Sequence, residues 1–238
     1  MTTTATTAPA TAADFTDQYY QDTSAALHWL SAQDQANLTN QGRPVPPTGW
    51  TAITGAQAQA LLNPAPTVAQ AQAAQTAILS AACAAAITAG FTASALGTPN
   101  TYTLSATDQT NLISAYTAAQ QASSSAKPWV AGATVAQYAV AEVNGAYYLA
   151  LTAGATGAAA PAWPTAFQQE VTDGTVTWAI AGWLLGTSAG NRWHTPSQVV
   201  AAYNAYLAWV NGQRAKYTAL AAQISAAATV AAVQAVTW

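Results

Sequence analysis

The side chains best suited to binding chemistry in this chain are aromatic residues gathered between residues 129 and 178. Their rings can stack on the apolar faces of sugars, while neighbouring amide and hydroxyl groups hydrogen-bond the sugar hydroxyls. Candidate contacts are Trp163, Tyr147, Trp129, Tyr138 and Asn144, and Trp178 completes the aromatic set. Charged residues are few here, whereas phosphate and nucleic acid require clustered Lys and Arg. We therefore expect that a ligand binding here is a polysaccharide.

The same rings have a second interpretation, as the hydrophobic core of a small β module. A module of about 50 residues has few other side chains from which to build a core. Successive residues of a strand face opposite sides of a sheet, so Tyr147 and Tyr148 cannot both face that core. Trp163 lies between two prolines, and we expect it in a loop with its ring exposed. The core candidates are Trp129, Tyr148 and Trp178. Both interpretations remain open from the sequence.

Turn signals predict the strands that would position these rings. Residues 135–143 are rich in β-branched and aromatic side chains, Asn144-Gly145 follows, and the pattern resumes over 147–152. Asn and Gly both accept positive φ, which makes this pair a strong hairpin signal. Asp173-Gly174 predicts a second tight turn before a third strand over 175–178. The sequence thus predicts a three-stranded antiparallel module over residues 127–182.

The flanking segments predict an Ala- and Gln-rich helical scaffold, residues 19–126 and 190–238, with the β module inserted between its helices. The fold class is therefore α+β. Helix starts are expected after Ser31, Thr54, Thr67, Ser105, Thr195 and Thr229, most of which open a capping pattern, and Gly90 is a helix-ending residue. A short N-terminal strand pair is expected from the His28 segment and residues 50–53. Residues 1–18 are expected to be a flexible arm, and 91–104 and 179–190 to be irregular.

The helix that follows Thr195-Pro196 has an apolar seam with alternating spacings of three and four residues. The pattern predicts a self-associating coiled coil, a trimer above other homo-oligomers, or a helix docked on the chain's own helices. Its seam residues are Val199, Tyr203, Tyr206, Val210, Gln213, Tyr217, Leu220 and Ile224. The sequence leaves the intermolecular and intramolecular alternatives open.

The composition favours a protein that functions as part of a larger assembly. Only 5% of the residues are charged, against about 25% in an average soluble protein, which leaves little protection against association. The net charge of −3 gives no electrostatic footprint for nucleic acid. A single cysteine, Cys83, excludes an intramolecular disulfide. Residues 68–87 are apolar, but the glutamines within them argue against membrane insertion.

Enzyme signatures are missing from the sequence. It has no Gly-rich phosphate loop, no H-E-x-x-H and no G-x-S-x-G. Glu142 and Glu170 could be placed as a glycosidase pair, but an exposed charge before a turn is the ordinary explanation of Glu142. His28 and His194 are far apart in sequence. We expect no catalytic residues, no metal site and no cofactor.

Two resemblances bear on function. The Trp129, Gly145-x-Tyr147-Tyr148 and Pro161-x-Trp163 spacing, closed by D-G-T-V-T-W178, resembles chitin-binding-type carbohydrate modules of phage tail and fibre proteins. Segments such as A-L-H-W-L-S-A-Q-D-Q and T-Y-T-L-S-A-T-D-Q-T-N-L, with the ending T-V-A-A-V-Q-A-V-T-W238, resemble a family of uncharacterised phage proteins encoded among tail genes. That second resemblance covers residues 20–122 and 193–238.

The resemblances imply a virion protein of the phage tail or tail fibre, soluble in the host cytoplasm before assembly. Its partners would be other virion proteins and, through the β module, host-surface polysaccharide. Two alternatives stay open: a tail-fibre assembly chaperone absent from the mature particle, and a purely structural decoration protein.

Overall fold

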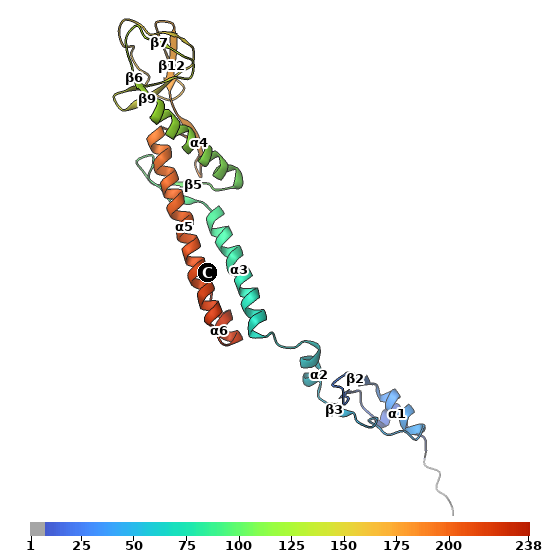
Figure 1. Cartoon of the computed structure of the whole chain (residues 1–238). Coiled ribbons are helices and arrows are strands. Elements are labelled where there is room, and N and C mark those ends of the chain that lie inside the picture. Colours follow the sequence, from blue (N-terminus) through green and yellow to red (C-terminus); the bar gives the residue numbers. More distant parts are fainter. Residues whose placement is uncertain (1–7) are drawn as a thin grey trace, which may run out of the picture. The chain divides into compact units, whose positions relative to one another are not determined.

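The computed structural model describes residues 8–238 and confirms the α+β fold class. The chain divides into two compact units, Met1–Ala69 and Gln70–Trp238 (Figure 1). The second unit contains the candidate site, so the first is described only briefly.

The first unit is a three-stranded antiparallel sheet with two helices. Its elements are the 3-10 helix η1 (Ala12–Asp14), β1 (Gln18–Gln21), β2 (Leu27–Leu30), α1 (Ala32–Asn40), β3 (Thr51–Ile53) and α2 (Gly55–Leu62). The strand order is β2-β1-β3, so β1 lies between the two strands that were predicted to pair with each other. Ser31 and Thr54 cap α1 and α2 with reciprocal hydrogen bonds, as predicted.

The predicted flexible arm requires a correction for its described part. Residues 1–7 lie outside the described residues. Beyond them, Ala10 exchanges two hydrogen bonds of 2.8 Å with the Asn40 side chain, and η1 forms a capping box between Thr11 and Asp14. These contacts hold residues 10–14 against the end of α1, because both polar groups of one backbone residue are satisfied by a single amide.

The helices of the second unit begin where the capping residues predicted. They are α3 (Val68–Thr88), α4 (Ala106–Ser125), α5 (Pro196–Ala226) and α6 (Val230–Gln234). Ser105 and Thr195 accept hydrogen bonds from the third helical residue, and that residue's side chain binds back to the cap. Helix α6 ends at Gln234.

Two segments that were expected to be irregular form a four-stranded sheet. Its strands are β4 (Phe91–Ala93), β5 (Asn100–Tyr102), β13 (Trp183–Thr187) and β14 (Gly190–His194), in the order β14-β13-β5-β4. The sequence-based expectation failed because these strands are short and because β5 and β13, far apart in the chain, meet at the Tyr102–Thr187 pair. Phe91, Tyr102, Leu104 and Leu185 pack from this region into the core shared with α4 and α5.

The α5 seam packs on the chain's own elements, which is the intramolecular alternative. Val199 is fully buried in the core with residues of α4, and the Tyr203 ring stacks on Tyr116 with centroids 3.9 Å apart. The Tyr206 ring lies 6.1 Å from Phe91. Further along, seam residues Val210 and Ile224 are buried, and Gln213, Tyr217 and Leu220 are half-buried.

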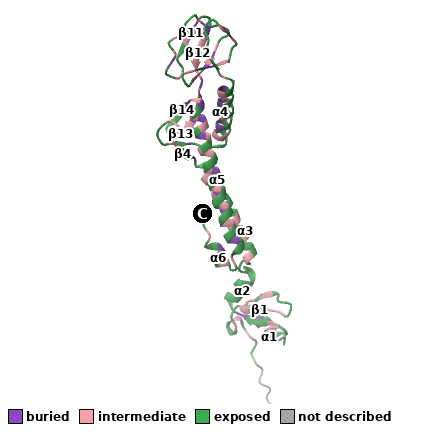
Figure 2. Cartoon of the chain, turned by 60° about the vertical axis from the view of Figure 1, so that its left-hand side comes forward, coloured by how far each residue is buried: buried purple, intermediate pink, exposed green. Residues whose placement is uncertain are grey.

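Helix α3 runs beside the C-terminal half of α5 (Figures 1 and 2). The Gln72 amide donates to the Ile224 carbonyl at 3.1 Å, and the Gln75 amide donates to Val236 at 2.7 Å. Much of the opposite face of α3 is exposed, including Ile78. By length and composition alone α3 could cross a membrane, although core helices of soluble proteins pass the same test.

Candidate ligand-binding groove

The β module consists of a five-stranded sheet and a separate strand pair rather than the predicted three strands. The sheet order is β11-β12-β9-β8-β6, and β10 pairs with β7. Their bounds are β6 (Lys127–Pro128), β7 (Thr134–Val135), β8 (Val140–Val143), β9 (Ala146–Ala150), β10 (Gly154–Ala155), β11 (Glu170–Asp173) and β12 (Val176–Ile180). Strand β6 escaped prediction because it is two residues long and pairs in parallel with β8.

Both predicted tight turns are present. Asn144 and Gly145 have φ of 53° and 78° and join β8 to β9, as a two-residue hairpin turn requires. Gly174 joins β11 to β12 with φ of 61°, and a Cβ there would lie 2.3 Å from the Ala155 carbonyl oxygen. Residue 174 therefore needs glycine for both its conformation and its surroundings.

The module's rings divide between core and surface. Tyr148 and Trp178 are buried, whereas Tyr147 is half-buried on the other side of the strand, as its alternation predicted. The expectation that Trp163 has an exposed ring is wrong. Its centroid lies 4.4 Å from Tyr148 and 5.7 Å from Trp178, and its indole nitrogen is buried. The Tyr148 hydroxyl donates to the carbonyl of Pro164, which helps to hold the Trp163 loop against the core.

A buried carboxylate, Asp173, holds the aromatic residues in place. It is 3% exposed and accepts hydrogen bonds from three N–H donors in different segments of the module. Its Oδ2 accepts from Trp129 Nε1 at 2.8 Å and from Trp178 Nε1 at 3.1 Å, while Oδ1 accepts from the Gly157 amide at 2.7 Å. Three donors stabilise a carboxylate in the absence of a cation. The turn residue Asp173 thus also fixes the orientation of two tryptophans.

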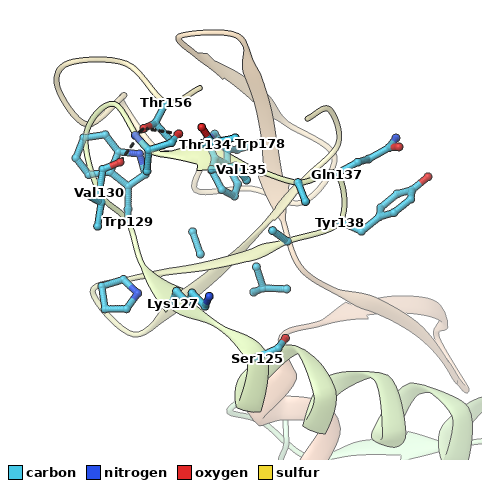
Figure 3. Close-up of a pocket in the computed structure, with 16 residues that line it drawn as sticks. Ser125, Lys127, Trp129, Val130, Thr134, Val135, Gln137, Tyr138, Thr156 and Trp178 are labelled. Carbon is cyan, nitrogen blue, oxygen red and sulfur yellow. Dashed lines mark hydrogen bonds between the residues drawn. The ribbon is translucent and has the colours of Figure 1, made fainter. Parts of the chain in front are cut away.

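A groove of about 630 Å³ opens on this module (Figure 3). This volume is typical of sites for small ligands. Trp129, Val130 and Thr156 lie at one end in Figure 3, and Gln137 and Tyr138 lie at the opposite end. Ser125 and Lys127 approach from the side of α4. Apolar side chains such as Val135 and Val140 form much of the rest of the lining.

The groove walls are held by local hydrogen bonds. The Thr156 hydroxyl is buried, donates to the Val130 carbonyl at 2.7 Å and accepts from the Ala133 amide at 2.8 Å. At the other end, the Tyr138 amide donates to Ala150 at 2.8 Å, which supports a positive φ of 66° at Tyr138. The Tyr138 ring is 67% exposed. An exposed ring on a fixed backbone is suited to stacking on a ligand.

Of the five predicted contact residues, the structure brings Trp129 and Tyr138 together in the groove. Trp163 packs into the core, Tyr147 lies on β9 outside the groove lining, and Asn144 occupies the hairpin turn. Sequence reasoning missed Gln137, Thr134, Thr156 and Lys127 as groove residues. The position of Lys127, Thr134 and Gln137 close to Trp129 or Tyr138 in the chain could have indicated these three, whereas Thr156 reaches the groove through its hydrogen bonds to Val130 and Ala133.

The two histidines have structural partners. His28 pairs with Asp22 at 2.8 Å and stacks on Trp50. Hydrogen bonds from the Ser24 side chain and then from His28 hold the pKa of Asp22 well below its usual range. His194 is fully buried; its Nδ1 donates to the Arg192 carbonyl and its Nε2 accepts from the Tyr102 hydroxyl, both at 2.8 Å. Burial lowers the pKa of His194. Residues 8–238 contain no group of three or more His, Cys, Asp or Glu placed to hold a metal ion.

Comparison with known proteins gives one match. A family described as a domain of unknown function, DUF4376, matches residues 70–147, which run from α3 through α4 and the first strands of the β module into β9. No curated protein and no solved structure matches the chain. Part of the chain, including Trp129, Tyr138 and most other groove residues, is therefore similar to a family whose description names no function.

Proposed function

We propose that this protein is a structural component of a bacteriophage virion, in the tail or tail fibre, whose β module binds host-surface polysaccharide. The observation that carries the proposal is the groove, whose lining combines an exposed tyrosine, Trp129 and uncharged polar side chains such as Gln137 and Thr134. Such a lining suits sugar rings and hydroxyl groups. The resemblance of the module to carbohydrate-binding modules of phage tail proteins supports the same conclusion.

The placement of the acidic residues supports binding rather than glycoside hydrolysis. Glu142 lies on β8 and Glu170 on β11, with β12 and β9 between those strands. Three strand spacings place the two backbones about 14 Å apart. Neither glutamate lines the groove.

The binding proposal is tested with Tyr138→Ala in the full chain. Because the ring is 67% exposed, its removal leaves the fold intact. A stacked ring contributes about 0.5–1.5 kcal/mol, so affinity for host polysaccharide should fall about two- to twelve-fold. The matched control is Trp29→Ala, which removes another exposed ring, 52% accessible and outside the β module. Equal adsorption of the Tyr138→Ala protein and the wild type to host cells would contradict a role for the groove.

The virion assignment is tested by mass spectrometry of purified particles. A tail or fibre component should be present at a fixed copy number relative to other tail proteins. Its absence from mature particles, with presence in infected-cell lysate, would identify an assembly chaperone instead.

We also propose that the protein is a homo-oligomer, most simply a trimer. The exposed and uncharged outer face of α3 supports this oligomer. The α5 seam does not, because it packs within the chain. No charged residue lies between Arg43 and Asp108 in the sequence, and an apolar helix this exposed favours association. Light scattering on the purified protein decides the point; a monomer at micromolar concentration would contradict it.

A further inference from the structure

Lys127 gives the groove a single positive charge. Among the described residues that line the groove, it is the only charged one. It opens strand β6, directly after the end of α4 at Ser125, and its side chain is exposed. Within residues 8–238, no carboxylate forms an ion pair with it. The ammonium group is therefore available to a ligand that lies along the groove.

The acidic side chain on the neighbouring strand lies outside the groove lining. Lys127 pairs with Ala141 and Pro128 with Glu142. Val140 and Ala141 of β8 line the groove, whereas Glu142 does not. The remaining carboxylate nearby, Asp173, is buried and already accepts three N–H donors. The groove therefore presents one cation without a neighbouring free anion.

We propose that the groove selects an acidic polysaccharide, in which the carboxylate of a sugar such as a uronic acid pairs with Lys127 while neighbouring sugar rings contact Trp129 and Tyr138. This inference rests on the proposed polysaccharide binding and adds the chemical class of the sugar. A carboxylate fits better than a phosphate group, because phosphate sites combine several donors, commonly from arginine, and no arginine lines this groove.

The test uses the full chain and a panel of acidic polysaccharides, polygalacturonate, alginate and hyaluronate, each beside its carboxyl-reduced form. The reduced form carries a neutral hydroxymethyl group in place of each carboxylate. The variants are Lys127→Gln, Lys127→Arg and the matched control Arg192→Gln, which removes one exposed positive charge outside the groove. Thermal unfolding of each variant establishes that it is folded.

We expect the wild type to bind at least one acidic form about two- to five-fold more tightly than its reduced form, the range for a partly exposed ion pair. Lys127→Gln should abolish that preference, whereas Lys127→Arg and Arg192→Gln should retain it. The preference should also shrink as salt is raised. The opposite pattern, with reduced polymers bound equally well or Lys127→Gln without effect, overturns the inference.

The panel separates this inference from the function on which it rests. If neutral polymers bind, Tyr138→Ala weakens that binding and Lys127→Gln leaves it unchanged, then polysaccharide binding is supported and the acidic class is wrong. If no polymer of either form binds the wild type, both proposals fall.

Discussion

Asp173→Asn is the sharpest test of how the aromatic residues of the β module are held. The substitution keeps the size of the side chain but leaves one acceptor oxygen where the carboxylate has two. If that oxygen faces the Trp129 and Trp178 indoles, the new amide group meets the Gly157 N–H, which lies 2.7 Å from Oδ1 in the wild type. If the amide flips, both indole donors lose their acceptor.

The expected loss of stability is set by the amide orientation that costs less free energy. A hydrogen bond to a charged group contributes about 1.5–3 kcal/mol, and a buried unsatisfied donor costs about 1–3 kcal/mol. We therefore expect the module to lose about 2–4 kcal/mol of stability, which corresponds to about a 30- to 900-fold fall in hydrogen-exchange protection. The whole effect should appear in residues 127–181.

Hydrogen exchange followed by mass spectrometry measures that local stability. The matched control is Glu170→Gln, which neutralises an exposed carboxylate of the same strand and should change stability by less than about 0.5 kcal/mol. If the amides of the module are as well protected from exchange in Asp173→Asn as in Glu170→Gln, the carboxylate does not hold the two tryptophans and the reasoning is refuted.

Three further outcomes are expected. His194 is buried with its pKa lowered, so its contribution to stability is fully present above its unfolded pKa of about 6.5 and is lost as pH falls below that value. After correction for the intrinsic pH dependence of amide exchange, the protection of β13 and β14 should fall between about pH 6.5 and 5, in the wild type and in the His28→Gln control alike. Constant protection over this range would contradict the expectation. Trp163→Ala removes a ring packed on Tyr148 and Trp178. The substitution should destabilise the module by about 2–4 kcal/mol, measured by thermal unfolding. An effect no larger than that of Tyr138→Ala would show that Trp163 is not part of the core. Ser105→Ala removes the cap of α4 and should lower the free energy of unfolding by about 1 kcal/mol, measured by chemical denaturation. If the exposed mid-helix substitution Ser80→Ala lowers it by the same amount, the cap contributes nothing.

Features set by neighbouring residues could be predicted from the sequence. The helix starts at Ser105 and Thr195 depend on a side chain three residues away, and the Asn144-Gly145 turn depends on two adjacent residues. Each therefore leaves a complete signal within a few positions. The α+β class followed, because those local signals alternate along the chain.

Features set by distant partners could not be predicted. Strand β5 pairs mainly with β4 and β13 mainly with β14, but the join between the two pairs rests on Tyr102 and Thr187, which are far apart in the chain. Asp173 was identified only as a turn residue, since its bond to Trp129 joins positions 44 residues apart. Trp163 was expected to be exposed because prolines flank it, but tertiary packing on Tyr148 decided its place. Among the groove residues, only Trp129 and Tyr138 were predicted as ligand contacts, and their arrangement in space could not be predicted.

The short connections of the β module have a mechanical consequence. Only Ala126 separates α4 from β6, and only two residues separate β12 from β13, so the module is attached by two stiff stems rather than by flexible linkers. A flexible tether would let each copy search a wide volume, whereas two stems restrict its swing. In an oligomer, several grooves would then lose little orientational entropy when they bind to a cell surface. The avidity obtained from individually weak contacts would therefore be higher.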